Sequence, residues 1–77
     1  MKRFKDKEFY NYYAVAIEHS YYVNSGTFVK IDKNEVEKVK RDGVYEFPYT
    51  YNMHFETDKL KCVVVKETVS KTYEILK

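Results

Sequence analysis

The feature that most constrains the fold is an alternation of side chains over residues 44–56. The odd-numbered positions of this segment are large and apolar: Tyr45, Phe47, Tyr49, Tyr51, Met53 and Phe55. The even-numbered positions are mostly polar. Because neighbouring side chains of a β-strand point to opposite faces, the pattern predicts one long strand with an aromatic face and a polar face. Pro48 lacks an amide hydrogen, which places this strand at a sheet edge or at a bulge.

An antiparallel partner strand is expected next in the chain. Residues 57–60 are typical of a turn, and residues 62–68 then form the returning strand. Its register stays open, because a loop of two or four residues would place Cys62 and Val64 beside the aromatic face. A loop of three residues would instead place there Val63, Val65 and Val69. Since both sets are apolar, we expect this strand to lie centrally in the sheet, covered on both faces.

One short helix is expected over residues 33–42. Asp32 is a suitable N-cap, and Glu35, three residues later, would complete a capping box. Gly43 stands where the left-handed residue that ends a helix is usually found. The segment contains only two valines as an apolar stripe, so we expect the helix to pack on a sheet instead of standing alone.

The remaining segments favour strands. Residues 9–23 are rich in Tyr, Val and Ile, which favours a strand, although a helix beginning at Asp6 is the alternative. Asn-Ser-Gly at 24–26 predicts a turn into a second strand at 27–31. Residues 69–76 fit either helical or strand spacing, and we prefer the strand.

Together these elements predict an α+β fold of order β-β-α-β-β-β, with four or five antiparallel strands and one helix. A chain of 77 residues makes a single domain, 1–77, and a basic N-terminal arm occupies residues 1–7. Tyrosine aside, no apolar run exceeds four residues, which predicts no membrane span. A lone cysteine cannot form an internal disulfide, so we expect an intracellular, cytoplasmic setting.

Two biases in composition concern the source of the protein. Lysine outnumbers arginine twelve to two, and glutamine is absent. Enrichment in charge with few labile amides is typical of hyperthermophiles. The same residues are also those that an AT-rich genome encodes, and either origin suits a small viral or mobile-element protein.

The residues that carry chemistry do not form a recognisable constellation. His19, His54 and Cys62 lie in separate segments, at spacings that predict no metal site. Cys62 lies in a valine-rich strand, where a thiol usually behaves as a small buried hydrophobe. The two glycines leave none for a phosphate-binding loop. We therefore expect no enzymatic activity and no cofactor.

The shortage of helix predicts an interaction module. A helix of ten residues cannot cover both faces of such a sheet, so aromatic surface should remain for a protein partner or for a second copy in a homodimer. Tyrosine suits this role because it buries a large area while keeping a polar tip. The predicted interaction surface consists of Tyr10, Tyr12, Tyr13, Tyr45, Phe47, Tyr49, Tyr51, Met53 and Phe55.

The alternative is a protein that binds single-stranded RNA or DNA. Exposed tyrosines on a sheet can stack on bases while lysines contact phosphates. The net charge of only +2 and the scarcity of arginine weaken this alternative. Its predicted contacts are Lys2, Arg3, Lys5, Lys7, Tyr22, Lys30, Lys61 and Lys66.

Overall fold

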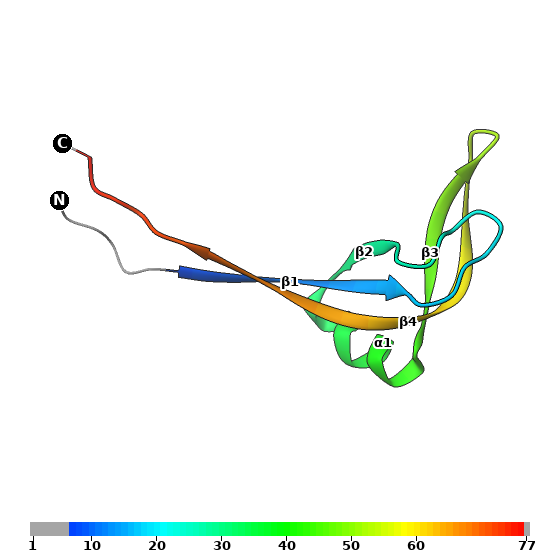
Figure 1. The fold of residues 1–77 in the computed structure, drawn as a ribbon, viewed down its shortest axis with the longest axis horizontal. Coiled ribbons are helices and arrows are strands. Elements are labelled where there is room, and N and C mark those ends of the chain that lie inside the picture. The colour runs from blue at the N-terminus through cyan, green and yellow to red at the C-terminus, as the bar shows by residue number, and fades with distance from the viewer. Residues whose placement is uncertain (1–6, 77) are drawn as a thin grey trace.

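The computed structural model describes residues 7–76, which form one antiparallel sheet with a short helix. The strands follow the order β2-β1-β4-β3 in the sheet, and Figure 1 shows α1 beside the middle of β4. The α+β class is thereby confirmed, with four strands. The elements are β1 (Lys7–Ala16), β2 (Phe28–Ile31), a 3₁₀ turn (Lys33–Glu35), α1 (Val36–Asp42), β3 (Val44–Tyr51) and β4 (His54–Lys71).

The long strand β4 holds the sheet together because it pairs with two partners in succession. Its first part pairs with β3, from Tyr51↔His54 to Val44↔Lys61. Its second part pairs with β1, from Ala16↔Cys62 to Lys7↔Lys71. The strand predicted over residues 62–68 is confirmed as part of β4, but the expected central, doubly covered position is wrong. Beyond Cys62 this stretch pairs with β1 alone, and Val63 is 46% exposed. The short β2 extends the sheet beside β1, and β3 is the other edge strand, as Pro48 indicates.

The strand predicted over residues 44–56 is wrong in its extent, because the chain reverses at Asn52 and Met53. Both residues have positive φ angles, 48° and 66°, and they form a two-residue hairpin turn. The turn expected at 57–60 therefore lies within β4. The alternation continues through the real turn in the sequence, which concealed the reversal, but a two-residue turn exchanges the faces. Phe55 consequently lies on the face opposite to Tyr51.

The helical segment is confirmed, although its beginning differs from the expected capping box. Residues 33–35 form a 3₁₀ turn, and the Asp32 side chain makes no capping hydrogen bond. Instead, the backbone N–H of Glu35 donates to the Asp32 carbonyl oxygen at 2.9 Å. The helix ends as predicted, since Gly43 is left-handed with φ 69° and its N–H donates to the Val39 carbonyl oxygen.

The first strand confirms the preference for β structure but ends at Ala16, not near residue 23. Residues 17–27 form a loop that Ala16 closes, because its N–H donates to Thr27 and its carbonyl oxygen accepts from Gly26. This loop contains the predicted turn at 24–26. The predicted last strand, 69–76, is the end of β4 as far as Lys71. Of the predicted basic arm 1–7, residues 1–6 lie outside the described residues, and Lys7 begins β1.

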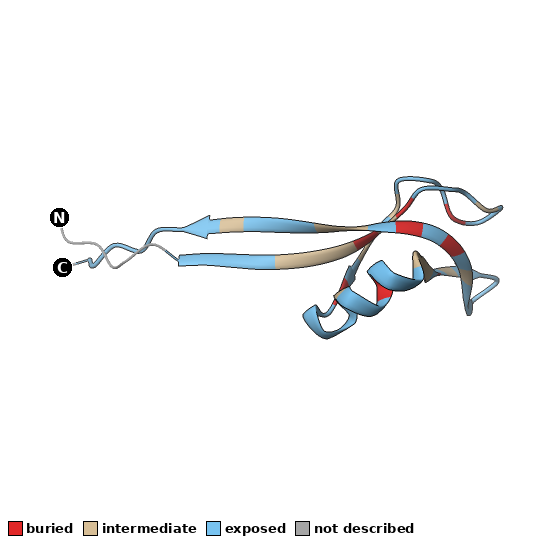
Figure 2. Ribbon diagram, turned by 90° about the horizontal axis from the view of Figure 1, so that it is seen from below, coloured by how far each residue is buried: buried red, intermediate tan, exposed pale blue. Residues whose placement is uncertain are grey.

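The core is small and lies at one end of the molecule. Its largest fully buried side chain is Phe47, with Val39 of α1 and Val23 of the 17–27 loop packed over the sheet. Figure 2 shows the buried residues gathered near α1. By contrast, no residue of 7–13 or 63–76 is buried. Residues 7–11 and 67–71, here called the ribbon, pair only with each other.

Candidate docking surface

The pairing registers define two faces of the sheet. The covered face, under α1 and the 17–27 loop, carries the buried residues of the strands, such as Ala14, Phe47 and Leu60. The opposite face, here called the open face, carries the odd-numbered residues of β1 and β4 and the even-numbered residues of β2 and β3. Around β1 its apolar residues are Phe9, Tyr13, Val15, Phe28, Val63, Val65 and Val69.

These apolar side chains lie along one strip, which the polar pair Asn11↔Glu67 interrupts. Phe9 is paired with Val69, and Tyr13 with Val65, along the β1–β4 ladder. The Tyr13 ring meets the Phe28 ring edge-on, with centroids 5.7 Å apart. Phe28 is 60% exposed, and Phe9 is 42% exposed. Large apolar side chains gathered on one uncovered sheet face are typical of a binding surface.

A polar cluster fixes the middle of the open face. The Glu67 carboxylate accepts hydrogen bonds from the Asn11 amide at 3.0 Å and from the Tyr13 hydroxyl at 2.9 Å. These two bonds hold the pKa of Glu67 below its ordinary value. The same carboxylate raises the pKa of Tyr13, because the phenol donates to it. The cluster therefore joins β1 to β4 and orients the Tyr13 ring.

Charge is divided unequally between the two faces. On the strands, the open face carries two carboxylates, Glu46 and Glu67, against five lysines: Lys7, Lys30, Lys59, Lys61 and Lys71. The covered face of the strands carries one lysine against three carboxylates: Lys66, Glu8, Glu56 and Asp58. The modest net charge of the chain thus conceals a sheet with one basic face and one acidic face.

The nine residues predicted as an interaction surface do not share one surface. Met53 occupies the hairpin turn, and only Tyr13 and Phe55 lie on the open face. Phe47 is fully buried. The alternation places on the covered face Tyr10, Tyr12, Tyr45, Phe47, Tyr49 and Tyr51.

A tyrosine from the 17–27 loop covers part of this aromatic face. The Tyr22 ring stacks on Tyr49 with centroids 4.6 Å apart and an interplanar angle of 12°, and it also meets Tyr51 at 5.1 Å. Val23, the next residue, is buried. The loop therefore supplies some of the cover that the short helix lacks on this face.

The residues predicted for nucleic-acid binding are also divided. Lys7, Lys30 and Lys61 lie on the open face. Lys66 lies on the covered face, with its ammonium 4.9 Å from the centre of the Tyr10 ring, and Tyr22 belongs to the loop. Lys2, Arg3 and Lys5 lie outside the described residues.

Sequence reasoning missed most of the open face. Val63, Val65 and Val69 were predicted only as one of two sets that could lie beside the aromatic face, because the length of the hairpin loop was not determined by the sequence. The signal that could have identified them is the alternation Phe9, Asn11, Tyr13, Val15, read against the valines of β4. That comparison needs the β1–β4 register, which the structure supplies.

The remaining candidates for chemistry are isolated. Cys62 is a free, buried thiol, and burial raises its pKa, which favours the protonated form and not the reactive thiolate. The described residues contain no group of three or more His, Cys, Asp or Glu side chains placed to hold a metal ion. No helix within residues 7–76 has the length and apolar character needed to cross a membrane.

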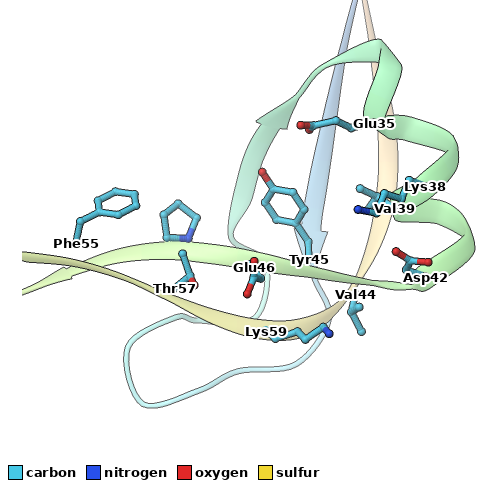
Figure 3. Close-up of a pocket in the computed structure, with 11 residues that line it drawn as sticks. Glu35, Lys38, Val39, Asp42, Val44, Tyr45, Glu46, Phe55, Thr57 and Lys59 are labelled. Carbon is cyan, nitrogen blue, oxygen red and sulfur yellow. The ribbon is translucent and has the colours of Figure 1, made fainter.

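An open hollow of about 760 Å³ follows the outer edge of β3 (Figure 3). Tyr45 points into the space between β3 and α1, toward Glu35 and Val39. Partial burial is the main reason that the pKa of Tyr45 is raised, and the nearby Glu35 and Asp32 carboxylates add to it. Positively and negatively charged side chains both line this hollow, so its lining residues do not gather charges of one sign at a single place.

Comparisons with known proteins found no match among family models, curated proteins or solved structures.

Proposed function

We propose that this chain is a small, non-enzymatic interaction module that docks its open face on the surface of another protein. The observation that carries the proposal is the apolar strip on β1, β2 and β4, which neither α1 nor the 17–27 loop covers. Tyr13 and Phe28 provide aromatic anchors of the kind that dominate binding energy at interfaces. The lone thiol Cys62 is buried and unpaired, which supports the additional proposal of an intracellular setting.

The extended shape supports docking. The radius of gyration is 17.3 Å, whereas a compact domain of this length has one of about 11.5 Å. Two-stranded ribbons are only marginally stable in water without a further strand or a packed face. The ribbon of residues 7–11 and 67–71 has neither among the described residues. A partner on the open face would supply the missing packing.

A comparative pull-down tests this proposal. The tagged full chain and its Val63→Lys and Val69→Lys variants are incubated with host lysate, with nuclease added, and the recovered proteins are quantified. Both valines lie on the open face and are at least partly exposed. Each lysine variant should therefore still fold, but the added charge should weaken docking. Thr68→Lys is the matched control, because Thr68 is the exposed neighbour on the other face.

We expect at least one protein whose recovery falls about tenfold with either valine variant, which corresponds to about 1.4 kcal/mol, and is unchanged with Thr68→Lys. Circular dichroism establishes that each variant is folded. If every recovered protein responded equally to all three variants, or to none, the open face would not be the docking surface.

Single-stranded nucleic acid is the second candidate, because Lys7, Lys30 and Lys61 share the open face with Phe9 and Phe28. Two features make it the weaker proposal. The Glu67 carboxylate lies in the middle of this face and would repel phosphates. The ammonium of Lys71 lies 4.9 Å from the centre of the Phe9 ring, where a base would stack.

Fluorescence anisotropy with a labelled single-stranded oligonucleotide tests the second candidate. Binding should fall steeply as salt rises, and Lys30→Glu with Lys61→Glu should weaken it at least tenfold if the open face is responsible. The control is Lys66→Glu, on the covered face. Absence of binding at about 50 mM salt, where phosphate contacts are strong, would eliminate nucleic acid as the ligand.

A further inference from the structure

We infer that the partner of the open face is an acidic, extended protein segment that pairs with the free edge of β4 as an additional strand. This inference rests on the proposed docking function and specifies the partner. Three observations carry it: an unpaired strand edge, the side chains beside that edge, and the excess of positive charge on the open face.

The free edge begins where β3 stops pairing. The last β3–β4 pair is Val44↔Lys61, and the N–H of Cys62 donates to the Gly43 carbonyl oxygen at 3.0 Å. Beyond Cys62, no described strand pairs with β4 on that side, whereas β1 continues on the other side to Lys71. Backbone groups of alternate residues point to the same edge. The N–H and C=O groups of residues 64, 66, 68 and 70 therefore point toward this unpaired edge.

This edge carries Lys66 and Lys71 but lacks other devices that prevent a strand from adding. Natural edge strands are protected by charged side chains, by proline, by bulges or by being short. The other long edge, along β3, contains Pro48. The free part of β4 contains no proline, and its pairing with β1 runs without a bulge over ten consecutive pairs. Strand addition to such an edge is a recurring way of binding peptides.

The side chains beside the edge specify what the added strand should carry. Along the free edge, the open face of β4 presents Val63, Val65, Glu67, Val69 and Lys71. Lys61 lies just before this edge, opposite Val44 of β3. Residues directly opposite on neighbouring strands interact, and opposite charges or paired apolar groups are favourable there. The best partner strand therefore has apolar residues in its centre and carboxylates near its ends.

The charges favour this partner over two others. A second copy placed face to face would oppose five lysines and two carboxylates with the same set, which repels. A nucleic acid would bring phosphates toward Glu67 and has no backbone amides to satisfy the β4 edge. An acidic protein strand satisfies the edge, the valines and the lysines together.

The molecule has enough free surface for such a partner. Its accessible surface is 6493 Å², while a compact protein of 9.3 kDa exposes about 5000 Å². The excess is larger than the roughly 800 Å² that each partner buries in an interface of standard size. Docking on this scale would therefore leave this chain with about the accessible surface of a compact protein of its mass.

The test uses the purified full chain and a labelled synthetic strand as the probe. The probe has threonine at alternate positions, valines at its remaining central positions and a glutamate at each end; a second probe has lysine at each end instead. In about 0.1 M salt, where the screening length is near 10 Å, we expect the acidic probe to bind about tenfold more tightly, because its terminal glutamates would lie near Lys61 and Lys71, whereas terminal lysines would be repelled there.

Two variants and one further measurement locate the binding. The double variant Lys61→Glu with Lys71→Glu should abolish or reverse the preference, whereas Lys66→Glu, on the covered face, should keep it. Hydrogen exchange should slow at the amides of residues 64, 66, 68 and 70 when the acidic probe is added. Slowing at the other residues of β4 alone would contradict strand addition.

The remaining outcomes also decide the matter. Equal affinity for both probes, or none, would overturn the inference. So would tighter binding of a labelled oligonucleotide, or self-association of the purified chain that Val69→Lys abolishes. If the probes failed while lysate proteins still depended on Val63 and Val69, the acidic strand would be wrong and the docking function would stand. If both experiments failed, the docking function would fall as well.

Discussion

Met53 occupies a left-handed backbone conformation, φ 66°, in the hairpin turn, while its side chain is 97% exposed. This conformation costs a residue with a Cβ atom about 1 kcal/mol, and glycine adopts it freely. We therefore expect Met53→Gly to stabilise the fold by up to about 1 kcal/mol and to raise the melting temperature by roughly 4–8 °C in thermal denaturation.

Met53→Ala is the control, because alanine keeps the strain and removes only an exposed side chain. It should leave the melting temperature nearly unchanged. If the glycine and alanine variants melted at the same temperature, the turn in solution would not have the conformation described here.

Glu67 should make stability depend on pH. Hydrogen bonds from Asn11 and Tyr13 lower its pKa from the ordinary 4.5, so the folded state binds this proton less readily than the unfolded state. The contribution of Glu67 to the free energy of unfolding is therefore complete above the ordinary pKa, and it is lost as the pH falls through the lowered pKa of the folded state. The stability difference between the protein and Glu67→Gln should shrink from about pH 6 to about pH 3 in urea denaturation.

Glu8→Gln serves as the comparison, since Glu8 accepts its hydrogen bond from Tyr10, two residues away in the same strand, and not from a neighbouring strand among residues 7–76. A stability difference for Glu67→Gln that stayed constant over the whole pH range would contradict the lowered pKa.

At the level of elements, the end of α1 depends on one backbone conformation. Gly43 is left-handed with φ 69°, and a Cβ added there would have no heavy atom within 4 Å. Gly43→Ala should therefore destabilise the protein by about 1 kcal/mol through backbone strain alone. Gly43→Asn should cost less, because asparagine tolerates this region better. Chemical denaturation measures both, and a loss for Gly43→Asn as large as that for Gly43→Ala would contradict backbone strain as the cause.

Element types were predictable where local and tertiary preferences agree. The strands are rich in Tyr, Val and Phe, Pro48 indicates an edge, and Gly43 ends the helix. The hairpin turn was not predictable, since Asn-Met lacks the glycine that usually marks it. The loop after Ala16 was not predictable either. Tyr22 and Val23 resemble strand residues, but their positions depend on packing against Tyr49 and the core.

The site was less predictable than the fold, because a face is defined only by pairing. A shortage of helical cover correctly indicated that some sheet surface would stay uncovered. Which surface stays uncovered depends on the β1–β4 register, and Tyr12 and Tyr13 fall on opposite faces because they are neighbours in one strand. The separation of charge between the faces depends on the same register.

For the whole molecule, the one-sided core predicts a gradient of local stability along β4. The core residues Leu60 and Cys62 are buried, whereas residues 67–71 are paired only with β1 and have no buried neighbour in sequence. Amides bonded within the β1–β4 ladder should therefore exchange with solvent much faster in the ribbon than beside Ala14 and Ala16. Hydrogen exchange followed by NMR measures this directly, and uniform protection along the ladder would contradict it.

The pairing of Lys7 with Lys71 also determines how the molecule should respond to mechanical load. In an antiparallel pair pulled apart from one end, the hydrogen bonds lie along the pulling direction and carry the load one after another. Tension applied through these two residues would thus unzip β1 from β4 stepwise toward the core, at low force. The same tension applied between Lys7 and the Asn52 turn would load many bonds at once in shear.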